Sequence, residues 1–456
     1  MFRKFVFLVC VCSLLVASIK PDDSYNYEAK YQHFRKERLA YNSEDVSSSS
    51  LIRPSQFGAD PTGIEDSSDA FDKAMAELVS RCKGHVMADD IMDCGSATID
   101  LEGGQYLISR SIVFPQMIGN FKMTGGTIRA TSDFNQNDFL IVVGKKECDN
   151  NQHSCNEFIS FSYIDFDCNL AAAGALFIGA TMGANVGPFN FFIHFMKNAI
   201  QIENGHETMI HQSWFGQYYY SKDASQVSFT ATGVLINSHD HYIHDSIFFH
   251  MKIGVQINGS SNILRGVHTW GCTYGVVLNG IFNRLENCFM DYTKLLIQNF
   301  NMNILRDTCF LFANIIAKPI GKQEVNGFHI ENSIYGRPGN MEAIQIDLSE
   351  GSFEKIQDTV INGQFSYIAN YTMKLTQVTR SLHLENSTEY TIDFEPYLFF
   401  KRIVSIQYAV ISEDKKFTRH FALAPEGTKV TVLFEEPVTA TVTISVDESN
   451  YYYQIN

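Results

Sequence analysis

The part of the sequence richest in groups that can transfer protons is the segment NSHDHYIHD, which spans residues 237 to 245. It contains His239, His241 and His244 together with Asp240 and Asp245. Histidine and aspartate act as general acids and bases, and histidine also binds metals. On an extended strand His239 and His241 share one face and His244 lies on the other, and no carboxylate spacing completes a ligand set. We therefore expect no metal and no cofactor here.

Carboxylates that could hydrolyse a glycosidic bond are the next candidates. The two carboxyl groups of such a pair flank the bond and are about 6.5–9.5 Å apart in inverting enzymes and about 5–5.5 Å apart in retaining enzymes. Asp240 and Asp245 are an odd number of residues apart, so they share a site only if the chain turns between them. Asp291 is a further candidate, and His268 could orient or protonate a partner. Each of these four catalytic candidates also has an ordinary structural explanation.

The elements that must position these residues repeat along the chain. GVLIN, GVQIN and GVVLN begin at Gly233, Gly254 and Gly275, at intervals of 21 residues, and a looser KLLIQ begins at Lys294. A period of this length is typical of a solenoid. Because the repeat has no helical pattern, each unit must be a coil of short strands, stacked about 4.8 Å apart. The sequence predicts an all-β fold, a parallel β-helix.

The second half of each repeat has its own regular columns. One column of branched apolar residues should point inward: Ile243, Leu264, Leu285 and Leu305. Two residues later, a column of turn formers predicts a corner between two strands: Asp245, Gly266, Asn287 and Asp307. Residues 208–215 match residues 241–248, but the interval between these two segments is 33 residues instead of 21. The 12 extra residues should form a loop around residues 216–226.

Polar side chains between the two columns should stack along the outside of the solenoid. This polar row consists of His211, His244, Arg265, Glu286 and Arg306. Such a stack could hold an extended anionic chain, because the local field decides where a polyanion docks. The alternative is a solvated face of mixed charge. From the row and the inserted loop we take four substrate-binding candidates: His211, Asp223, His244 and Arg265.

Both ends of the solenoid need a cap. Apolar residues at helical spacing predict an amphipathic helix over residues 67–81 that caps the N-terminal end: Phe71, Ala74, Met75, Leu78 and Val79. From about residue 385 the repeat changes to alternating strands separated by turns, which predicts a small antiparallel β domain. The alternative is a few irregular final coils. We therefore divide the chain into a leader at 19–51, a β-helix at 52–384 and a C-terminal domain at 385–456.

The N-terminus predicts export. Residues 1–18 have Arg3 and Lys4, an apolar stretch too short to span a bilayer, and small residues at the end, as a secretory signal has. Removing those two cations changes the formal charge from −15 to −17, which argues against nucleic acid and anionic membranes as partners. We expect a secreted monomer.

Eight cysteines remain after the signal, an even number suited to an oxidising compartment. The short-range pairs we expect are Cys82 with Cys94 and Cys148 with Cys155. Cysteines 272, 288 and 309 lie in the repeats, where a cysteine can equally be a small buried residue. Asn258, Asn370 and Asn386 begin glycosylation acceptor sequences.

Several segments resemble a known family. FGADPTGIEDSSDAF resembles the N-terminal signature of the pectate-lyase superfamily of right-handed β-helix proteins. HQSWFGQ, HDHYIHD, GVQINGSSNILRGVH, ENCFMDYT and the terminal DFEPYLFFKRIVSIQY resemble the quartet-type polygalacturonases of plants, which degrade pectin. The resemblance covers about residues 52–446. The positions that match include Asp240, Asp245, His268 and Asp291, whereas His244, Arg265 and Glu286 have no obvious match.

One departure affects the expected activity. The better-known polygalacturonases on this fold carry Asn-Thr-Asp, Asp-Asp, Gly-His-Gly and Arg-Ile-Lys motifs, and none of these occurs in the coils of this sequence. The resemblance implies hydrolysis of a polyuronide such as pectin, an anionic polysaccharide. Two alternatives stay open: β-elimination with Arg265 as the base, and a β-helix that binds glycans or forms part of a wall or coat without turnover.

Overall fold

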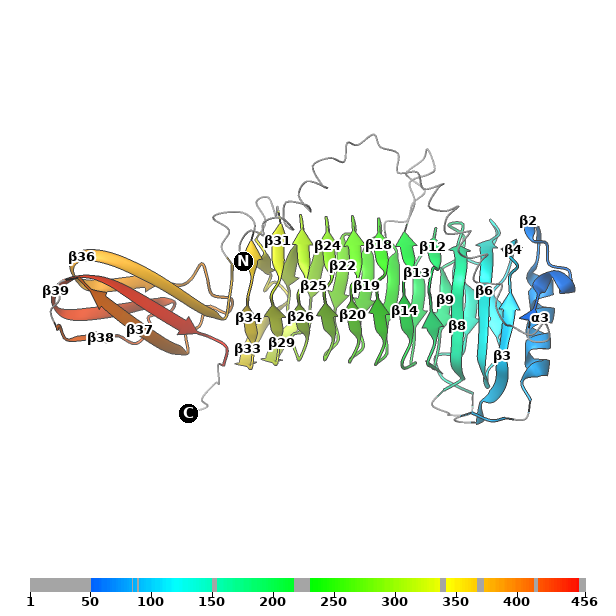
Figure 1. Cartoon of the computed structure of the whole chain (residues 1–456), viewed down its shortest axis with the longest axis horizontal. Helices are drawn as coiled ribbons and strands as arrows, with labels where there is room; N and C mark the ends of the chain where they lie inside the picture. Colours follow the sequence, from blue (N-terminus) through cyan, green and yellow to red (C-terminus); the bar gives the residue numbers. More distant parts are fainter. Residues whose placement is uncertain are drawn as a thin grey trace, which may run out of the picture. The chain divides into compact units, whose positions relative to one another are not determined.

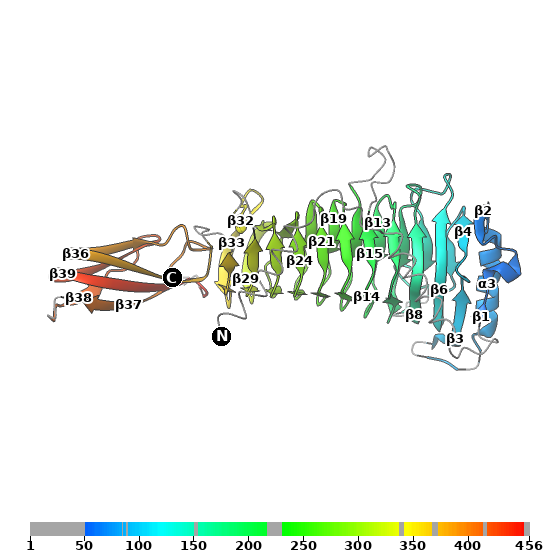
Figure 2. The ribbon, with the colours of Figure 1, turned by 45° about the horizontal axis from the view of Figure 1, so that its top comes forward.

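The computed structural model describes residues 51–83, 85–87, 90–149, 154–216, 230–336, 342–366, 373–413 and 417–450. Parallel strands stack side by side through most of this part of the chain, as a right-handed parallel β-helix (Figures 1 and 2). Each regular coil contributes one strand to each of three faces. The predicted fold class is therefore confirmed. Among the described residues, no helix is long and apolar enough to cross a membrane.

Face one is a parallel sheet whose neighbours come from successive coils. Its described strands are β5 (Ile112–Phe114), β7 (Phe139–Val143), β9 (Gly174–Ile178), β13 (Asn198–Ile202), β16 (Thr232–Ile236), β19 (Ile253–Ile257), β22 (Tyr274–Leu278), β25 (Lys294–Ile297), β28 (Asn314–Ala317) and β32 (Ile344–Ile346). The three Gly-led motifs lie on β16, β19 and β22, where Val234 pairs with Val255 and Val255 with Val276. This register confirms the predicted 21-residue coil.

Faces two and three follow face one within each coil. The strands of face two are β11 (Asn185–Val186), β14 (Met209–His211), β17 (Tyr242–His244), β20 (Ile263–Arg265), β23 (Arg284–Glu286), β26 (Ile304–Arg306), β30 (His329–Glu331) and β34 (Val360–Asn362). The strands of face three are β12 (Phe191–Ile193), β15 (Trp214–Gly216), β18 (Ile247–Phe249), β21 (His268–Trp270), β24 (Phe289–Asp291), β27 (Cys309–Leu311), β31 (Ile334–Gly336) and β35 (Phe365–Ser366). A two-stranded pairing of β29 (Gly321–Asn326) with β33 (Gly351–Gln357) adds to the last coils.

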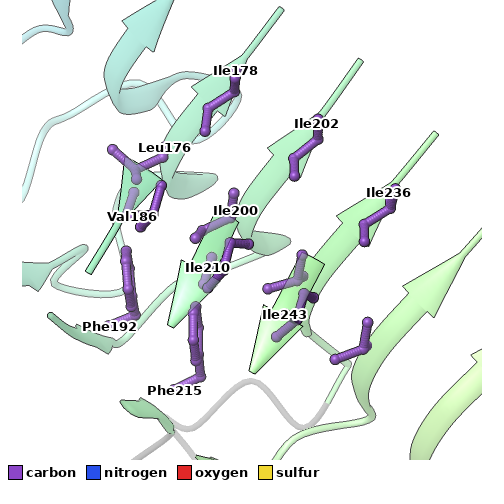
Figure 3. Packing of buried hydrophobic residues seen from close by; sticks show 14 of the residues in the cluster. Leu176, Ile178, Val186, Phe192, Ile200, Ile202, Ile210, Phe215, Ile236 and Ile243 are labelled. Carbon is purple, nitrogen blue, oxygen red and sulfur yellow. The ribbon is translucent and has the colours of Figure 1, made fainter. Parts of the chain in front are cut away.

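The core is a stack of apolar columns, one from each face. On face two, Ile210 pairs with Ile243 and the column continues through Leu264, Leu285 and Leu305, all of them fully buried. Figure 3 shows Ile210 and Ile243 of this column close to side chains of face one, such as Ile200 and Ile236. The pairing of Ile210 with Ile243 confirms the predicted interval of 33 residues, whose inserted loop lies outside the described residues.

The corner between faces two and three has one residue per coil in the left-handed backbone region. Asp245 (φ 49°), Gly266 (φ 62°), Asn287 (φ 52°) and Asp307 (φ 54°) occupy it. Glycine has no Cβ to clash there, and Asp and Asn tolerate the region better than other residues. The predicted turn column is therefore confirmed.

The corner between faces one and two is held by a buried ladder of side-chain amides. The backbone N–H of Asn262 donates to the side-chain oxygen of Asn283 (3.0 Å), and the N–H of Asn283 donates to that of Asn303 (2.8 Å). His241 begins this ladder, since its N–H donates to Asn262 (3.0 Å). We call these four residues the buried ladder.

The first coils are built from longer strands. The sequence order here is β1 (Leu51–Ile52), β2 (Thr62–Asp66), β3 (Met92–Asp100), β4 (Gln105–Ile108), β6 (Ile118–Ala130), β8 (Asn156–Asp167) and β10 (Thr181–Met182). β8 is long enough to pair with both β11 and β12, so it serves faces two and three at once. A short 3-10 helix, η1 (Pro54–Phe57), precedes the α-helix.

The helix α3 (Ser68–Arg81) confirms the predicted helix at 67–81. It buries Phe71, Ala74, Met75 and Leu78, and the Phe71 ring meets Tyr106 edge to face at 5.5 Å. Val79, placed in the apolar stripe, is instead 41% exposed. The prediction that Val79 belongs to the buried stripe was wrong, because the buried face of the helix is narrower than the spacing of apolar residues implied.

The C-terminal sheet is antiparallel, as predicted. The long strands β36 (Gln377–Asp393) and β39 (Lys429–Asp447) pair with each other, and β37 (Ser405–Ser412) and β38 (His420–Ala422) also pair with β39. Its buried residues form a separate apolar cluster that includes Tyr390, Val432 and Ile444. Because β36 begins at Gln377, it crosses the boundary that we placed between 384 and 385.

Segments of the C-terminal part also cover the last coil. The backbone N–H groups of Asp358, Thr359 and Ile361 donate to Asn450 Oδ1 (2.9 Å), the Ser449 carbonyl (3.2 Å) and Thr376 Oγ1 (3.0 Å). Glu448 is fully buried beside them and accepts from the N–H of Phe400 (2.8 Å). These bonds satisfy N–H groups in β34 and in the two residues before it.

Both predicted disulfides are present. Cys82 at the end of α3 is bonded to Cys94 on β3, and Cys148 is bonded to Cys155. Cys272 and Cys288 are reduced and buried in the coils, as small apolar residues would be.

Candidate functional site

The predicted polar row exists on face two. Neighbouring strands place His211 beside His244, His244 beside Arg265, and so on through Glu286 and Arg306. The His211 and His244 rings stack with centroids 5.1 Å apart and planes inclined by 7°. Partial burial, with the neighbouring His244, lowers the pKa of His211, so this imidazole is neutral near pH 7.

The charge of the row is mixed. Glu331 extends it by one coil and pairs with Arg306 at 3.1 Å. His211 Nε2 lies 2.9 Å from Asn185 Oδ1, and His244 Nδ1 lies 3.1 Å from Asp245 Oδ2. The row therefore alternates histidine, arginine and glutamate instead of presenting a uniform positive field.

A groove of about 560 Å³ opens at the N-terminal end of the polar row. Its lining includes Lys122, Phe158, Glu207, Met209 and His211. Phe158 is 66% exposed, in the left-handed region at φ 51°. The groove thus combines a cation, a carboxylate and an aromatic ring. Sequence reasoning found only His211 of this set, because Lys122 and Phe158 lie on the long strands outside the 21-residue repeat.

The histidine-rich segment is divided between the inside and the outside of the coil. His241 is buried, with Nε2 2.7 Å from Ser238 Oγ, and burial lowers its pKa to about 3. His239 is exposed and lies 2.6 Å from Ser260 Oγ. The expectation that His239 and His241 share a face was wrong, because Asp240 between them turns the chain at φ 63°. His241 is a structural member of the buried ladder.

Asp240 lies on the outside of that corner. Its Oδ2 is 3.6 Å from His206 Nδ1, and both side chains are well exposed. With Glu207, these two residues bring one ligand atom each within 4.8 Å of one another, a set that could hold a divalent metal. Exposed acidic groups often lie this close without a metal.

Face three carries the other two catalytic candidates. Asp291 ends β24 beside Trp270 of β21, and its buried Oδ1 has no hydrogen-bond partner among the described residues. Desolvation raises the pKa of Asp291 to about 6. His268 begins β21 with its ring edge-on to Phe289 at 4.9 Å. Its Nε2 is likewise buried and unpaired among the described residues, and burial lowers its pKa.

The structure brings only some of the predicted residues together. His268 and Asp291 lie diagonally on adjacent strands, roughly 8 Å apart at Cα from the strand spacing and the rise per residue. Asp245 is two coils from Asp291, about 10 Å along the axis, and on the opposite side of face three. Those two carboxylates are therefore too far apart to flank one glycosidic bond. Asp223 lies outside the described residues.

Comparison with known proteins identifies the family. Residues 55–277 match the rhamnogalacturonase A/epimerase family with a pectate-lyase-like fold. Polygalacturonase QRT3 of Arabidopsis thaliana is 31% identical over 406 residues, which cover 86% of this chain and 83% of that protein. The chain belongs to the pectate-lyase superfamily of right-handed β-helix proteins.

One of two similar solved structures, with a TM-score above 0.5, supports this fold. A protein from Geobacillus virus E2, the product of ORF18, has a TM-score of 0.53 and 11% identity over 86% of this chain and 77% of its own. The A-module of mannuronan C-5 epimerase AlgE6 from Azotobacter vinelandii has a TM-score of 0.43 and 10% identity, over 70% of this chain and 96% of its own. At 11% identity, the similarity to the Geobacillus virus protein shows a shared fold alone.

Proposed function

We propose that this superfamily member is a secreted glycoside hydrolase that cleaves a polyuronide such as pectin. Its relative is named a polygalacturonase, and the similarity extends over most of both chains. The disulfides Cys82–Cys94 and Cys148–Cys155 support an oxidising, extracellular setting.

The observation that carries the proposal is the state of Asp291. A carboxyl with its pKa raised to about 6 keeps its proton at mildly acidic pH, where an ordinary aspartate is ionised. Glycosidases use such a carboxyl to protonate the departing oxygen. Although Oδ1 is buried, the Asp291 residue as a whole is only partly buried, on the outer side of face three.

His268 supplies the complementary base. Burial lowers the pKa of His268, so its neutral, proton-accepting form persists to lower pH than in an exposed histidine. In the proposed step, Asp291 donates its proton to the glycosidic oxygen as the bond to the anomeric carbon breaks. Water bonds to that carbon and gives a proton to His268. The products are two shortened chains, an aspartate and an imidazolium, which return to the starting state by exchange with water.

The test uses residues 19–456 secreted from a eukaryotic host and incubated with pectin and polygalacturonic acid. Reducing ends and unsaturated uronates are followed in parallel. Hydrolysis produces reducing ends alone, whereas β-elimination produces both signals. We expect reducing ends, with a rate that falls above pH 6 as Asp291 ionises and falls again at low pH as His268 becomes protonated.

Asp291→Asn should lower the rate by about 10²- to 10⁴-fold, the usual contribution of a general acid. Asp307→Asn is the matched control, because Asp307 is a carboxylate at a coil corner where asparagine also fits the left-handed backbone. Equal rates for Asp291→Asn and the wild type would refute the assignment. Absence of turnover on every polymer, with binding retained, would favour the non-catalytic glycan-binding alternative.

A further inference from the structure

Exposed aromatic side chains cross face three obliquely, since Trp214 begins its strand, Trp270 ends its strand and Tyr292 directly follows β24. Trp214 is 39% exposed, Trp270 is 42% exposed and Tyr292 is 54% exposed. Trp214 meets Phe249 edge to face at 6.2 Å, and Phe249 lies 6.5 Å from Trp270. We call Trp214, Trp270 and Tyr292 the aromatic row. These side chains come from three of four successive coils, so the row extends about 14 Å along the axis.

Neighbouring rings fix the orientation of the row. His250 lies 4.5 Å from Trp270, and Phe312 stacks on Tyr292 at 4.5 Å with planes inclined by 11°. Tyr292 (φ 48°) and Phe312 (φ 49°) hold left-handed positions at the corner where Gly271 stands in the coil between Trp270 and Tyr274. Aromatic residues are disfavoured there. The coils thus keep large rings at positions that glycine would fill with less strain.

The row is uncharged apart from the proposed acid. Among the described residues of the eight face-three strands from β12 to β35, Asp291 is the only carboxylate, and lysine and arginine are lacking. Lys252 and Lys294 are exposed but lie two residues past the corner, at the start of the next coil. Exposed aromatic faces on successive coils suit the apolar faces of sugar rings in a chain that crosses these coils. An ionised uronate on these described strands would find no lysine or arginine to pair with.

We propose that the aromatic row is a stacking platform for a polysaccharide chain that crosses face three obliquely, and that it favours rings whose carboxyl groups are uncharged, as in methyl-esterified galacturonan. The identity of this polymer rests on the proposed function. The platform places Trp214 three coils before Asp291, Trp270 in the coil next to it and Tyr292 directly after it in the chain. The enzyme then cleaves esterified segments in preference to fully ionised ones.

Intrinsic fluorescence tests the platform directly, because Trp214 and Trp270 are the two tryptophans of the whole chain. The full secreted chain carrying Asp291→Asn is titrated with highly methyl-esterified pectin and with polygalacturonic acid. We expect a change in tryptophan emission and binding at least about five-fold tighter for the esterified polymer. Equal or tighter binding of polygalacturonic acid would overturn the preference for uncharged rings.

Trp270→Ala should weaken binding about ten-fold, the effect of losing one aromatic stacking partner. Phe282→Ala is the matched control, since Phe282 is 46% exposed at a different corner. An unchanged affinity for Trp270→Ala, with normal circular dichroism, would refute the platform. If pectin is hydrolysed with a wild-type KM by Trp270→Ala, the platform fails and the hydrolase stands. If emission responds but no polymer is cleaved, the hydrolase fails and the platform stands.

Discussion

We expect the buried ladder to contribute strongly to the free energy of unfolding. Asn283 lies in the middle of this ladder with no exposed surface. Its Oδ1 accepts from the Asn262 N–H (3.0 Å) and the Asn262 side-chain amide (3.1 Å), and its Nδ2 donates to the Gly259 carbonyl (3.2 Å). Asn283→Ala removes all three bonds and leaves the Asn262 N–H buried without its partner.

The magnitude follows from these contacts. An unsatisfied buried N–H costs about 1–3 kcal/mol, and the lost bond to Gly259 adds about 1 kcal/mol. We expect Asn283→Ala to lower the free energy of unfolding by about 2–4 kcal/mol. Asn279→Ala is the control, because Asn279 lies in the same coil but loses one partly exposed bond to Asn258 (2.8 Å). That change should cost about 1 kcal/mol or less.

Urea denaturation followed by far-ultraviolet circular dichroism measures both variants. Equal slopes of the unfolding transitions would permit a direct comparison of the free energies. If Asn283→Ala and Asn279→Ala destabilise the protein equally, the buried ladder contributes no more than a surface hydrogen bond, and the reasoning is refuted.

Two further predictions concern packing and pH. Gly254→Ala would place a Cβ 2.5 Å from the Gly275 carbonyl oxygen, so we expect a loss of about 1–3 kcal/mol in urea denaturation, whereas Gln256→Ala on the same strand should change little. Burial raises the pKa of Glu448 from 4.5 to about 7, so the folded state holds a proton that the unfolded chain releases between these values. The free energy of unfolding should therefore fall as pH rises from about 4.5 to 7, by at most about 3 kcal/mol, and Glu448→Gln should remove that slope. An unchanged slope in Glu448→Gln would contradict the assignment.

The regular coils could be predicted because stacked coils must place equivalent residues at equivalent positions. Once residues 233–237 recur at 21-residue intervals, every column must face the same way in each coil, and the inward position of Leu264 and the corner at Asp245 follow. The two short-range disulfides could also be predicted, since few other cysteines lie so close to Cys82 and Cys148 in the sequence.

The site was less predictable because it depends on local turns and on burial. His241 enters the core only because Asp240 adopts a left-handed conformation, which spacing alone does not reveal. The groove at Lys122 and Phe158 lies on long strands without the repeat. Asp291 could be named from its residue type, but its raised pKa depends on desolvation by side chains from neighbouring coils.

The hydrogen bonds at the edge of β34 have a consequence for the solubility of the whole solenoid. Nothing in the stacking of parallel strands itself ends the stack. An uncovered final coil is therefore a template to which a strand of another chain can pair, as in a growing fibril. Thr376, Ser449 and Asn450 occupy that edge. The C-terminal segments therefore protect this edge, and a chain ending before Met373 would expose unpaired N–H groups there and favour association of molecules through their C-terminal ends.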